Sequence, residues 1–408
     1  MKISVLILSF FLLEQALFSQ IDPSLLKTAP ADTSSAKLNM DAAYSRPMLS
    51  LNKIPVTLGG YLEVNWQKSS TDGISEGHQF QFRRFTIFMA STITSRIRFL
   101  SELEFEDGTK EISLEFAAVD FEFFPLLNLR GGIITNPIGS FNQNHDGPKW
   151  EFTDRPLSAT LLLPATFSNA GFGLYGKMTG GDWMLGYEAY LTNGLTTAII
   201  ENEENKTFLP AVKENPFRFE ESFNGKPMVT AKIAVRNTMT GELGLSYMGG
   251  VYNKSEDDGI PVDANRHCNV FALDYNHTIP GLRTYITAEM AWIRVDVPDT
   301  YTEQFGEKQY GGFVDLVQPL WRRRILTWEE AVLNLACRLE YVDWNSGKFD
   351  STGGNIGDET WSIMPALSFR PAPQTVLRFN YRYQRTSDFF GNPPATTVTY
   401  SLGLSTYF

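Results

Sequence analysis

The sequence predicts an all-β fold: a transmembrane antiparallel β-barrel of about 16 strands with one loop folded into its interior. Three observations predict it: an export signal at the N-terminus, segments of alternating polarity along most of the chain, and a final segment that ends in Phe408. Together they predict a signal peptide over residues 1–19, a mobile periplasmic leader over 20–54 and the barrel over 55–408.

The N-terminus has the pattern of an export signal. A lysine precedes an apolar stretch from Ile3 to Leu13, and the small residue Ser19 follows after a few polar positions. About eleven apolar residues are too few to anchor a helix in a membrane, which indicates a cleavable signal. No cysteine follows the stretch, so a lipid anchor is not expected. Residues 20–54 are polar without a steady period, which predicts a mobile leader.

The remainder of the chain alternates between apolar and polar residues with period two. Within residues 56–67, for example, Leu62 and Trp66 share one parity, while Glu63 and Asn65 share the other. Successive side chains of a strand point to opposite faces, so each such segment has one apolar and one polar face. The breaks between segments alternate between short and long, as the two ends of a transmembrane barrel require.

Four local features refine this pattern. The parity slips near Ala117 and Ala118, which predicts a β-bulge. Residues 68–79 are expected to form a long outer loop, and residues 319–328 a longer inner connection. The basic run Arg322 to Arg324 is placed on that inner connection, between strands twelve and thirteen, as a solvated turn or a contact for an anionic partner.

The apolar face is expected to meet lipid. A barrel of about 16 strands encloses a space too wide to be filled by side chains, so its polar face must line water. Aromatic residues near segment ends, such as Trp66, Trp183 and Trp344, predict interfacial girdles. In the final segment Val398, Tyr400 and Phe408 share one parity, and a terminal aromatic resembles the signal that outer-membrane assembly machinery recognises.

Composition argues against several other classes of protein. The net charge of −11 and a pI of about 5.0 argue against nucleic acid as a partner. Cys268 and Cys337 are too few for a disulfide scaffold or a paired zinc site. The four histidines lie in loops or at strand ends, and no G-x-S-x-G or H-E-x-x-H motif occurs. We therefore expect no enzymatic activity, no cofactor and no metal.

Several stretches carry a family resemblance. Phe82-Arg83-Arg84 opens the second segment, Leu127 to Gly132 precedes Asn136-Pro137, and Phe152 to Ser158 is followed by Asn169 to Gly176. In order and spacing these stretches resemble the phosphate-selective porin O and P family of the outer membrane. The resemblance implies a sixteen-stranded porin, commonly a homotrimer, whose pore is narrowed by an inward loop.

The loop expected to narrow the pore spans Pro137 to Asn169, because it is long and carries both charged and apolar residues. Its apolar Leu161 to Leu163 favour burial against the barrel wall. An ordinary outer loop is the alternative. The residues expected to line or constrict the pore are Arg84, Arg96, Arg98, Glu102, Glu104, Arg130, Lys149, Glu151, Asp154, Arg155, Arg378 and Arg382.

Acidic and basic residues alternate along this predicted lumen, whereas the founding members of the family line their pore with Arg and Lys. Phosphate selectivity therefore does not follow from the resemblance. The first hypothesis is passive diffusion of small hydrophilic solutes or ions. The alternatives are an anion-selective porin for phosphate or dicarboxylates, and a non-conducting structural or adhesive barrel. The expected partners are outer-membrane lipid, the assembly machinery through Phe408, and two further copies of the chain.

Overall fold

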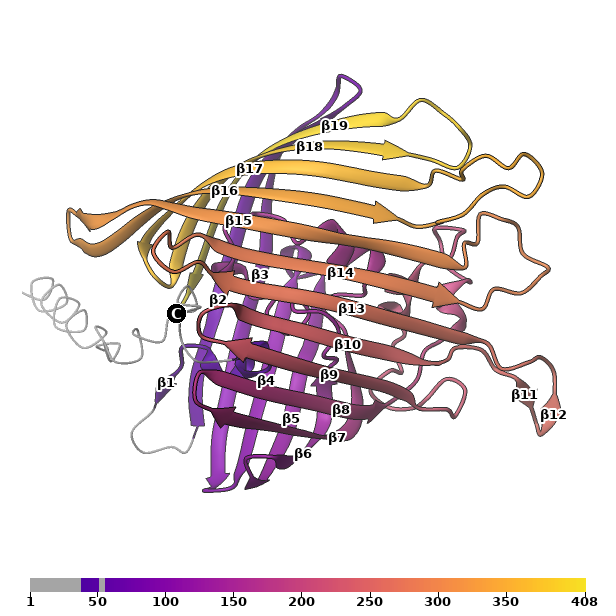
Figure 1. Ribbon diagram of the computed structural model, residues 1–408, viewed down its shortest axis with the longest axis horizontal. Helices are drawn as coiled ribbons and strands as arrows, with labels where there is room; N and C mark the ends of the chain where they lie inside the picture. Colours follow the sequence, from indigo (N-terminus) through magenta and orange to yellow (C-terminus); the bar gives the residue numbers. More distant parts are fainter. Residues whose placement is uncertain (1–37, 51–55) are drawn as a thin grey trace, which may run out of the picture.

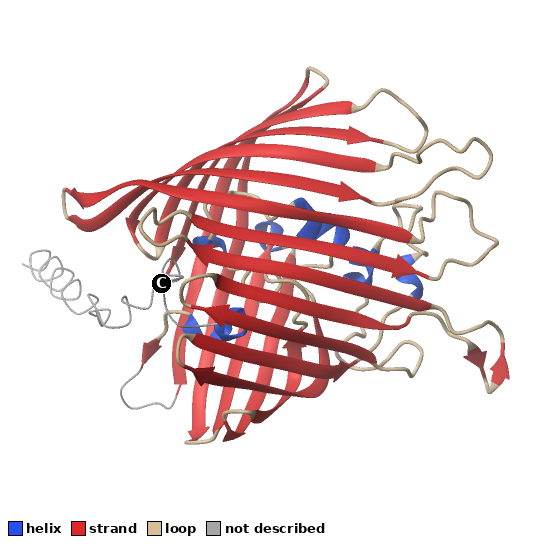
Figure 2. Ribbon diagram, in the orientation of Figure 1, coloured by secondary structure: helices blue, strands red, loops and turns tan. Residues whose placement is uncertain are grey.

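The computed structural model describes residues 38–50 and 56–408, so the predicted signal peptide and the first part of the leader lie outside the described residues. The described chain forms a closed barrel of 16 antiparallel strands (Figures 1 and 2). No helix in this part of the chain combines the length and apolar character needed to cross a membrane. The predicted fold class is confirmed.

The barrel strands follow the chain around the wall. Their bounds are β2 Val56–Thr71, β3 Ile74–Thr94, β4 Ile97–Glu106, β5 Glu111–Phe124, β6 Leu127–Thr135, β7 Ser168–Gly180, β8 Trp183–Thr192, β9 Met228–Asn237, β10 Gly241–Val251, β13 His267–Thr278, β14 Tyr285–Val295, β15 Lys308–Ile325, β16 Trp328–Asp343, β17 Glu359–Ala372, β18 Thr375–Ser387 and β19 Ala395–Tyr407. Each strand pairs with its neighbour in sequence, and β19 pairs with β2 to close the sheet.

Short elements complete the fold. A two-residue strand, β1 (Leu49–Ser50), pairs with the start of β2, and β11 (Glu256–Asp257) and β12 (Ile260–Pro261) form an outer hairpin. The helical turns are η1 Asn39–Asp41, η2 Ala43–Ser45, η3 Asp107–Thr109, η4 Gly147–Lys149, η5 Ser158–Leu162, η6 Thr197–Ile199 and η7 Leu209–Glu214. Figure 2 shows several of them inside the ring of strands.

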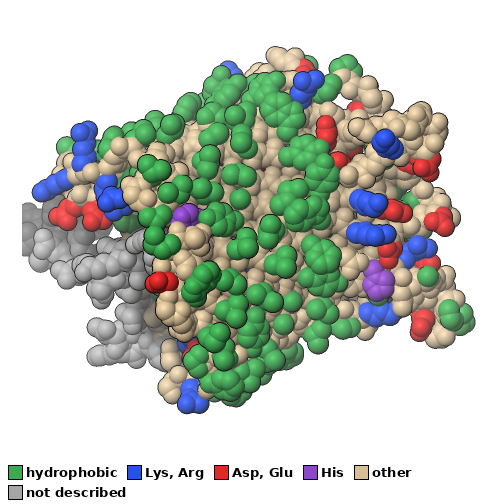
Figure 3. Space-filling model, viewed as in Figure 1, with side chains coloured by type: hydrophobic (Ala, Val, Ile, Leu, Met, Phe, Trp, Pro, Cys, Tyr) green, Lys and Arg blue, Asp and Glu red, His purple; other side chains and the backbone are tan. Residues whose placement is uncertain are grey.

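The two faces of the wall have the polarity that the alternation predicts. On β2, Tyr61, Glu63 and Asn65 are buried inside the barrel. Large apolar side chains such as Ile233 and Leu245 are more than half exposed on the outside, at 57% and 59%. Figure 3 shows hydrophobic side chains over the middle of the visible face and charged ones towards its two ends. Such a band matches the hydrocarbon layer of a membrane.

Turn lengths alternate between the two ends as predicted, but two strand pairs are longer than expected. Residues 68–79 are not a loop: β2 and β3 continue to a tight turn at Asp72 and Gly73, whose φ angles are +50° and +85°. Residues 319–328 are not a connection either, because β15 and β16 pair as far as Ile325 and Trp328. In both pairs the strands continue beyond the apolar band. Alternation of polar and apolar residues is no longer required there, so the sequence does not display the pattern that predicts a strand.

The basic run lies on a strand and not on the predicted connection. Arg322 to Arg324 lie on β15, in a hairpin that projects beyond its neighbours in Figure 1, and not in a turn. The bulge expected near Ala117 is present at Glu115, which lies between the pairs Leu114–Leu103 and Phe116–Glu102.

Candidate pore constriction

The segment between β6 and β7, residues 136–167 and here called the constriction loop, runs through the interior of the barrel. Carboxylates of the opposite wall hold its backbone. Glu289 accepts hydrogen bonds from the N–H groups of Ser140 (2.7 Å) and Phe141 (3.0 Å). Glu340 accepts one from Leu157 at 2.8 Å. The prediction of an inward-folded loop is therefore confirmed, and the alternative of an ordinary outer loop is excluded.

Arginines from the wall hold the carbonyl groups of the same loop. Arg378 on β18 donates to the carbonyl of Phe152 at 2.7 Å and pairs with Glu63 at 2.7 Å. Arg338 on β16 donates to the carbonyl of Asp154 at 2.7 Å. Its other nitrogens form two bonds of 2.7 Å to the carboxylate of Asp315. Charge-assisted bonds of this kind fix geometry, so the path of the loop is rigidly specified.

An apolar cluster secures the loop at its second half. Leu162 and Leu163 are buried, as the sequence predicted for this stretch, and pack with Leu195 and Ile199 of the loop after β8 and with wall residues such as Val270. Burial of this apolar surface adds to the polar anchoring.

Beside the constriction loop the lumen carries a cluster of charged side chains, here called the eyelet cluster: Arg83, Arg84, Asp154, Arg155 and Arg382, of which all but Arg382 are partly exposed. Arg83 pairs with Asp154 at 2.8 Å, and Arg382 lies 3.9 Å from the same carboxylate. Arg155 lies 3.4 Å from both Glu104 and Glu106 on the wall, and Arg84 contacts the same two residues. Both signs of charge therefore face the water at the constriction.

A β-bulge places two consecutive arginines in this cluster. The pairing skips from Glu63–Arg84 to Val64–Phe82, so that Arg83 is unpaired. Without the bulge Arg83 would follow the parity of the outer face. The sequence analysis did not assign Arg83 to the lumen, and the adjacent pair of arginines was the only signal that could have suggested it.

The remaining predicted site residues separate into two groups. Lys149, Glu151, Arg378 and Glu102 are buried and act as anchors within the barrel. Arg96, Arg98 and Arg130 lie towards the end of the barrel that carries the short turns, away from the constriction. Arg96 belongs to the turn between β3 and β4, and Arg98 pairs with Glu122 beside it. Only part of the predicted set thus meets at one place.

Residues 38–48, here called the N-terminal segment, also lie inside the barrel, although the sequence predicted a mobile leader there. The buried guanidinium of Arg46 lies 2.8 Å from Glu102 on β4 and 2.6 Å from Asp146 on the constriction loop. It also lies 4.0 Å from the ring of Phe88. The polar composition that suggested mobility reflects a segment whose partners are charged lumen residues.

Two clusters of carboxylates resemble metal sites in composition. In Glu102, His145 and Asp146, one ligand atom of each lies within 4.8 Å of the others. The guanidinium of Arg46 bridges the two carboxylates and already supplies the positive charge that a cation would bring. In the second cluster, Glu104, Glu106 and Glu115, arginines contact two of the three members. Neither donor set fits a metal ion.

The electrostatics of Asp146 give a pH prediction. Burial alone would raise the pKa of this carboxyl, but Arg46 and Lys149 hold the pKa well below its usual range. Its ionised form therefore stabilises the fold above the unfolded pKa of about 3.9, and this contribution declines as the pH falls further towards the folded pKa. Asp146→Asn is expected to lower the thermal unfolding temperature at pH 7, and the difference from the wild type should shrink below about pH 4. A difference that stayed constant down to pH 3 would contradict the assignment.

Comparison with known proteins supports the fold. No protein-family model matches the chain. An uncharacterized protein of Aquifex aeolicus (strain VF5) is 30% identical over 165 residues, which cover 39% of this chain and 36% of that relative. The chain therefore matches little more than a third of the relative's length.

Solved outer-membrane proteins share the architecture at low identity. OmpF of Salmonella typhi has a TM-score of 0.54 and 10% identity, over 88% of this chain and 100% of that one. An anion-selective porin from Comamonas acidovorans has a TM-score of 0.53 and 9% identity, over 86% and 99%. OprB of Pseudomonas putida has a TM-score of 0.52 and 10% identity, over 86% and 94%. The chain has the barrel fold of these porins.

Proposed function

We propose that the chain is an outer-membrane porin that lets small hydrophilic solutes or ions diffuse passively through its lumen. The observation that carries this proposal is the combination of an apolar outer band with an interior of ionised side chains, narrowed by a loop that the wall holds in place. The porin fold of the compared structures supports it. No enzymatic activity, cofactor or nucleic-acid partner is part of the proposal.

The eyelet cluster supports weak selectivity for charge. Arg83, Arg84, Arg155 and Arg382 face Asp154, Glu104 and Glu106 within a few ångströms. An anion passing the cluster meets attraction and repulsion together, unlike in a lumen lined by bases alone. We therefore propose that the chain shares the architecture of the phosphate-selective porin O and P family, and we do not propose that it selects phosphate.

The proposal includes the steps by which a porin is exported and assembled: removal of a signal peptide over 1–19, insertion by the barrel assembly machinery, and assembly as a homotrimer. The C-terminal strand supports insertion by the assembly machinery. Phe408 donates its N–H to the carbonyl of Gly60 at 3.0 Å, and its ring stacks on Phe85 at 5.6 Å between centroids. The last residue is therefore part of the seam that closes the barrel.

Planar-bilayer recording of the purified full chain tests the proposal. Stepwise ohmic currents with a small reversal potential in a salt gradient are expected. Block of the current by millimolar phosphate would favour the anion-selective alternative instead. Silence of both the wild type and a variant that lacks residues 38–48 would exclude a channel.

Arg155→Gln is expected to shift the permeability ratio towards cations. The substitution leaves Glu104 and Glu106 without one of their basic partners at the constriction. We expect a change on the order of threefold, because a unit charge within about 6 Å of the path contributes on the order of 0.7 kcal/mol in a water-like dielectric. Reversal potentials in a salt gradient measure this permeability ratio.

The control for this prediction is Arg385→Gln. Arg385 on β18 is opposite the outward-facing Trp361, so its replacement removes the same charge from the outer surface. The reversal potential of the control should equal that of the wild type. Equal shifts in both variants would mean that net charge, and not the eyelet cluster, sets selectivity.

The second candidate function is a barrel that is closed at rest. The N-terminal segment favours it, since Arg46 joins the wall to the constriction loop across the lumen and is almost fully buried. A low conductance of the wild type that rises when the segment is removed would identify this state.

A further inference from the structure

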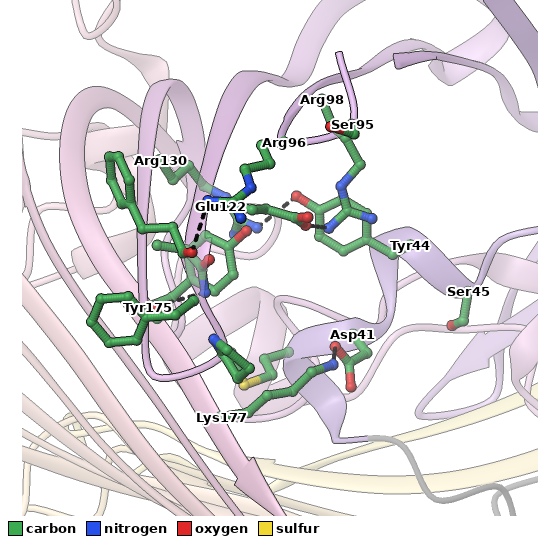
Figure 4. A pocket seen from close by; sticks show the side chains of 15 residues that line it. Asp41, Tyr44, Ser45, Ser95, Arg96, Arg98, Glu122, Arg130, Tyr175 and Lys177 are labelled. Atoms are coloured by element: carbon green, nitrogen blue, oxygen red, sulfur yellow. Dashed lines mark hydrogen bonds and ion pairs between the residues drawn. The ribbon is translucent and has the colours of Figure 1, made fainter. Parts of the chain in front are cut away.

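A cavity of about 700 Å³ lies beside the short-turn end of the barrel, which is the periplasmic end of a porin. The N-terminal segment forms one wall with Met40, Asp41 and Tyr44, and strands β4 to β7 with the turns before β4 and after β5 form the other. Figure 4 shows Arg96, Glu122 and Arg130 of the strand wall on one side and Tyr44 and Asp41 of the N-terminal segment on the other, with Lys177 reaching Asp41. Neither the constriction loop nor the eyelet cluster lines this cavity, so it is separate from the proposed constriction.

The walls of the cavity carry an excess of basic groups. Arg98 pairs with Glu122, Arg130 with Asp120 at 2.8 Å, and Lys177 with Asp41 at 2.8 Å. A fourth base has no such partner. The guanidinium of Arg96 donates to the carbonyl of Phe123, at 3.4 Å, and no carboxylate of the described residues lies within ion-pair distance of it. One exposed guanidinium is therefore available to an anion.

The cavity also offers flat apolar surface. The guanidinium carbons of Arg98 and Arg130 lie 4.9 Å and 5.5 Å from the centroid of the Tyr44 ring, which lines the cavity. Its hydroxyl donates to Asp120 and accepts a bond of 2.7 Å from Arg130, which fixes the ring in place. Met40 lies at the same wall. Stacked rings and guanidinium planes favour a flat partner.

We propose that this cavity binds a small aromatic monocarboxylate. Its carboxylate pairs with Arg96 beside Arg98, and its ring lies in the space bounded by Tyr44 and Met40. Inorganic phosphate would gain the charge interaction but none of the apolar contact, and a neutral aromatic amide would gain only the contact. The site goes beyond passive diffusion, because it would retain one class of solute where the lumen meets the periplasm.

Titration calorimetry of the full chain in detergent, with benzoate as the probe, tests the proposal. Saturable binding of benzoate is expected, with weaker binding of acetate, phosphate and benzamide. Arg96→Ala should weaken the binding of benzoate about tenfold, the loss expected for one charge-assisted contact. Arg96→Lys should restore part of it, and Arg385→Ala, which removes an outward-facing base, should leave it unchanged.

Three results would overturn the proposal: no saturable heat with benzoate, equal affinities in Arg96→Ala and Arg385→Ala, or phosphate binding as tightly as benzoate. Because Arg96 is in an exposed turn, its replacement should leave the fold intact. Circular dichroism of the same samples shows whether a loss of binding is caused by unfolding. Benzoate-free conductance is a separate measurement, so failure of this site would leave the proposed channel standing.

Discussion

Deletion of residues 38–48 is expected to raise the single-channel conductance several-fold. The N-terminal segment lies within the barrel and contacts the wall and the constriction loop together. Because conductance depends on the open cross-section of the narrowest stretch, removing a segment that fills part of the lumen should widen the path for ions. Bilayer recordings of the two proteins at the same salt concentration give the comparison.

Arg46→Ala should reproduce much of this effect without shortening the chain. The substitution removes the guanidinium that Glu102 and Asp146 share, and Asp146 keeps Lys149 at 3.2 Å. Glu102 is then the buried charge without a close basic partner, and leaving such a charge uncompensated costs about 3–5 kcal/mol. Release of the segment lets water reach both carboxylates, so the segment should leave the lumen. Arg46→Lys keeps the charge but not the fork geometry, and an intermediate conductance is expected.

A deletion of the same length in an outer loop, residues 254–264, is the matched control. This stretch contains the β11–β12 hairpin, which projects from the long-loop end in Figure 1 and is exposed along most of its length. Its removal should not change conductance. Equal conductance in the wild type, the 38–48 deletion and Arg46→Ala would refute the N-terminal segment as an obstruction.

The part of the fold that follows from periodicity was predictable from the sequence. Alternation over ten or more residues determines which side chains face the barrel interior, so Glu63, Arg84 and Arg378 could be assigned to the inner face one by one. The length and mixed composition of the constriction loop indicated that it enters the barrel. These signals are local, and a sequence displays them without any knowledge of long-range contacts.

Contacts between distant segments could not be predicted in the same way. Arg46 and Asp146 are 100 residues apart, and nothing in the polar composition of the leader indicates a partner in the lumen. Arg83 was missed because one extra residue in β3 reverses the parity on which the assignment rests. Residues 319–328, the end of the β15–β16 hairpin, were predicted as a connection because strand pairing beyond a membrane needs no apolar face. In each case a tertiary pairing overrides the local pattern.

Arg338→Ala is expected to have the largest effect on stability. Arg338 is fully buried and holds Asp315 of the neighbouring strand through two bonds of 2.7 Å, and it donates a third to the carbonyl of Asp154. Without Arg338 the buried carboxylate of Asp315 has no ion-pair partner, and the constriction loop loses one of its anchors. The expected cost is about 3–5 kcal/mol, measured as a lower midpoint of unfolding in denaturant.

A double variant separates the two consequences. Arg338→Met together with Asp315→Leu removes both charges of the pair and fills similar volume, so most of the lost stability should return. The carbonyl of Asp154 would still lack its donor, and the eyelet cluster, in which Asp154 holds Arg83, should stay loosened. The expected result is therefore an unfolding midpoint close to that of the wild type together with an altered reversal potential. If conductance and selectivity recovered fully with stability, Arg338 would support the barrel wall alone, and the path of the loop would depend on Arg378 and the wall carboxylates.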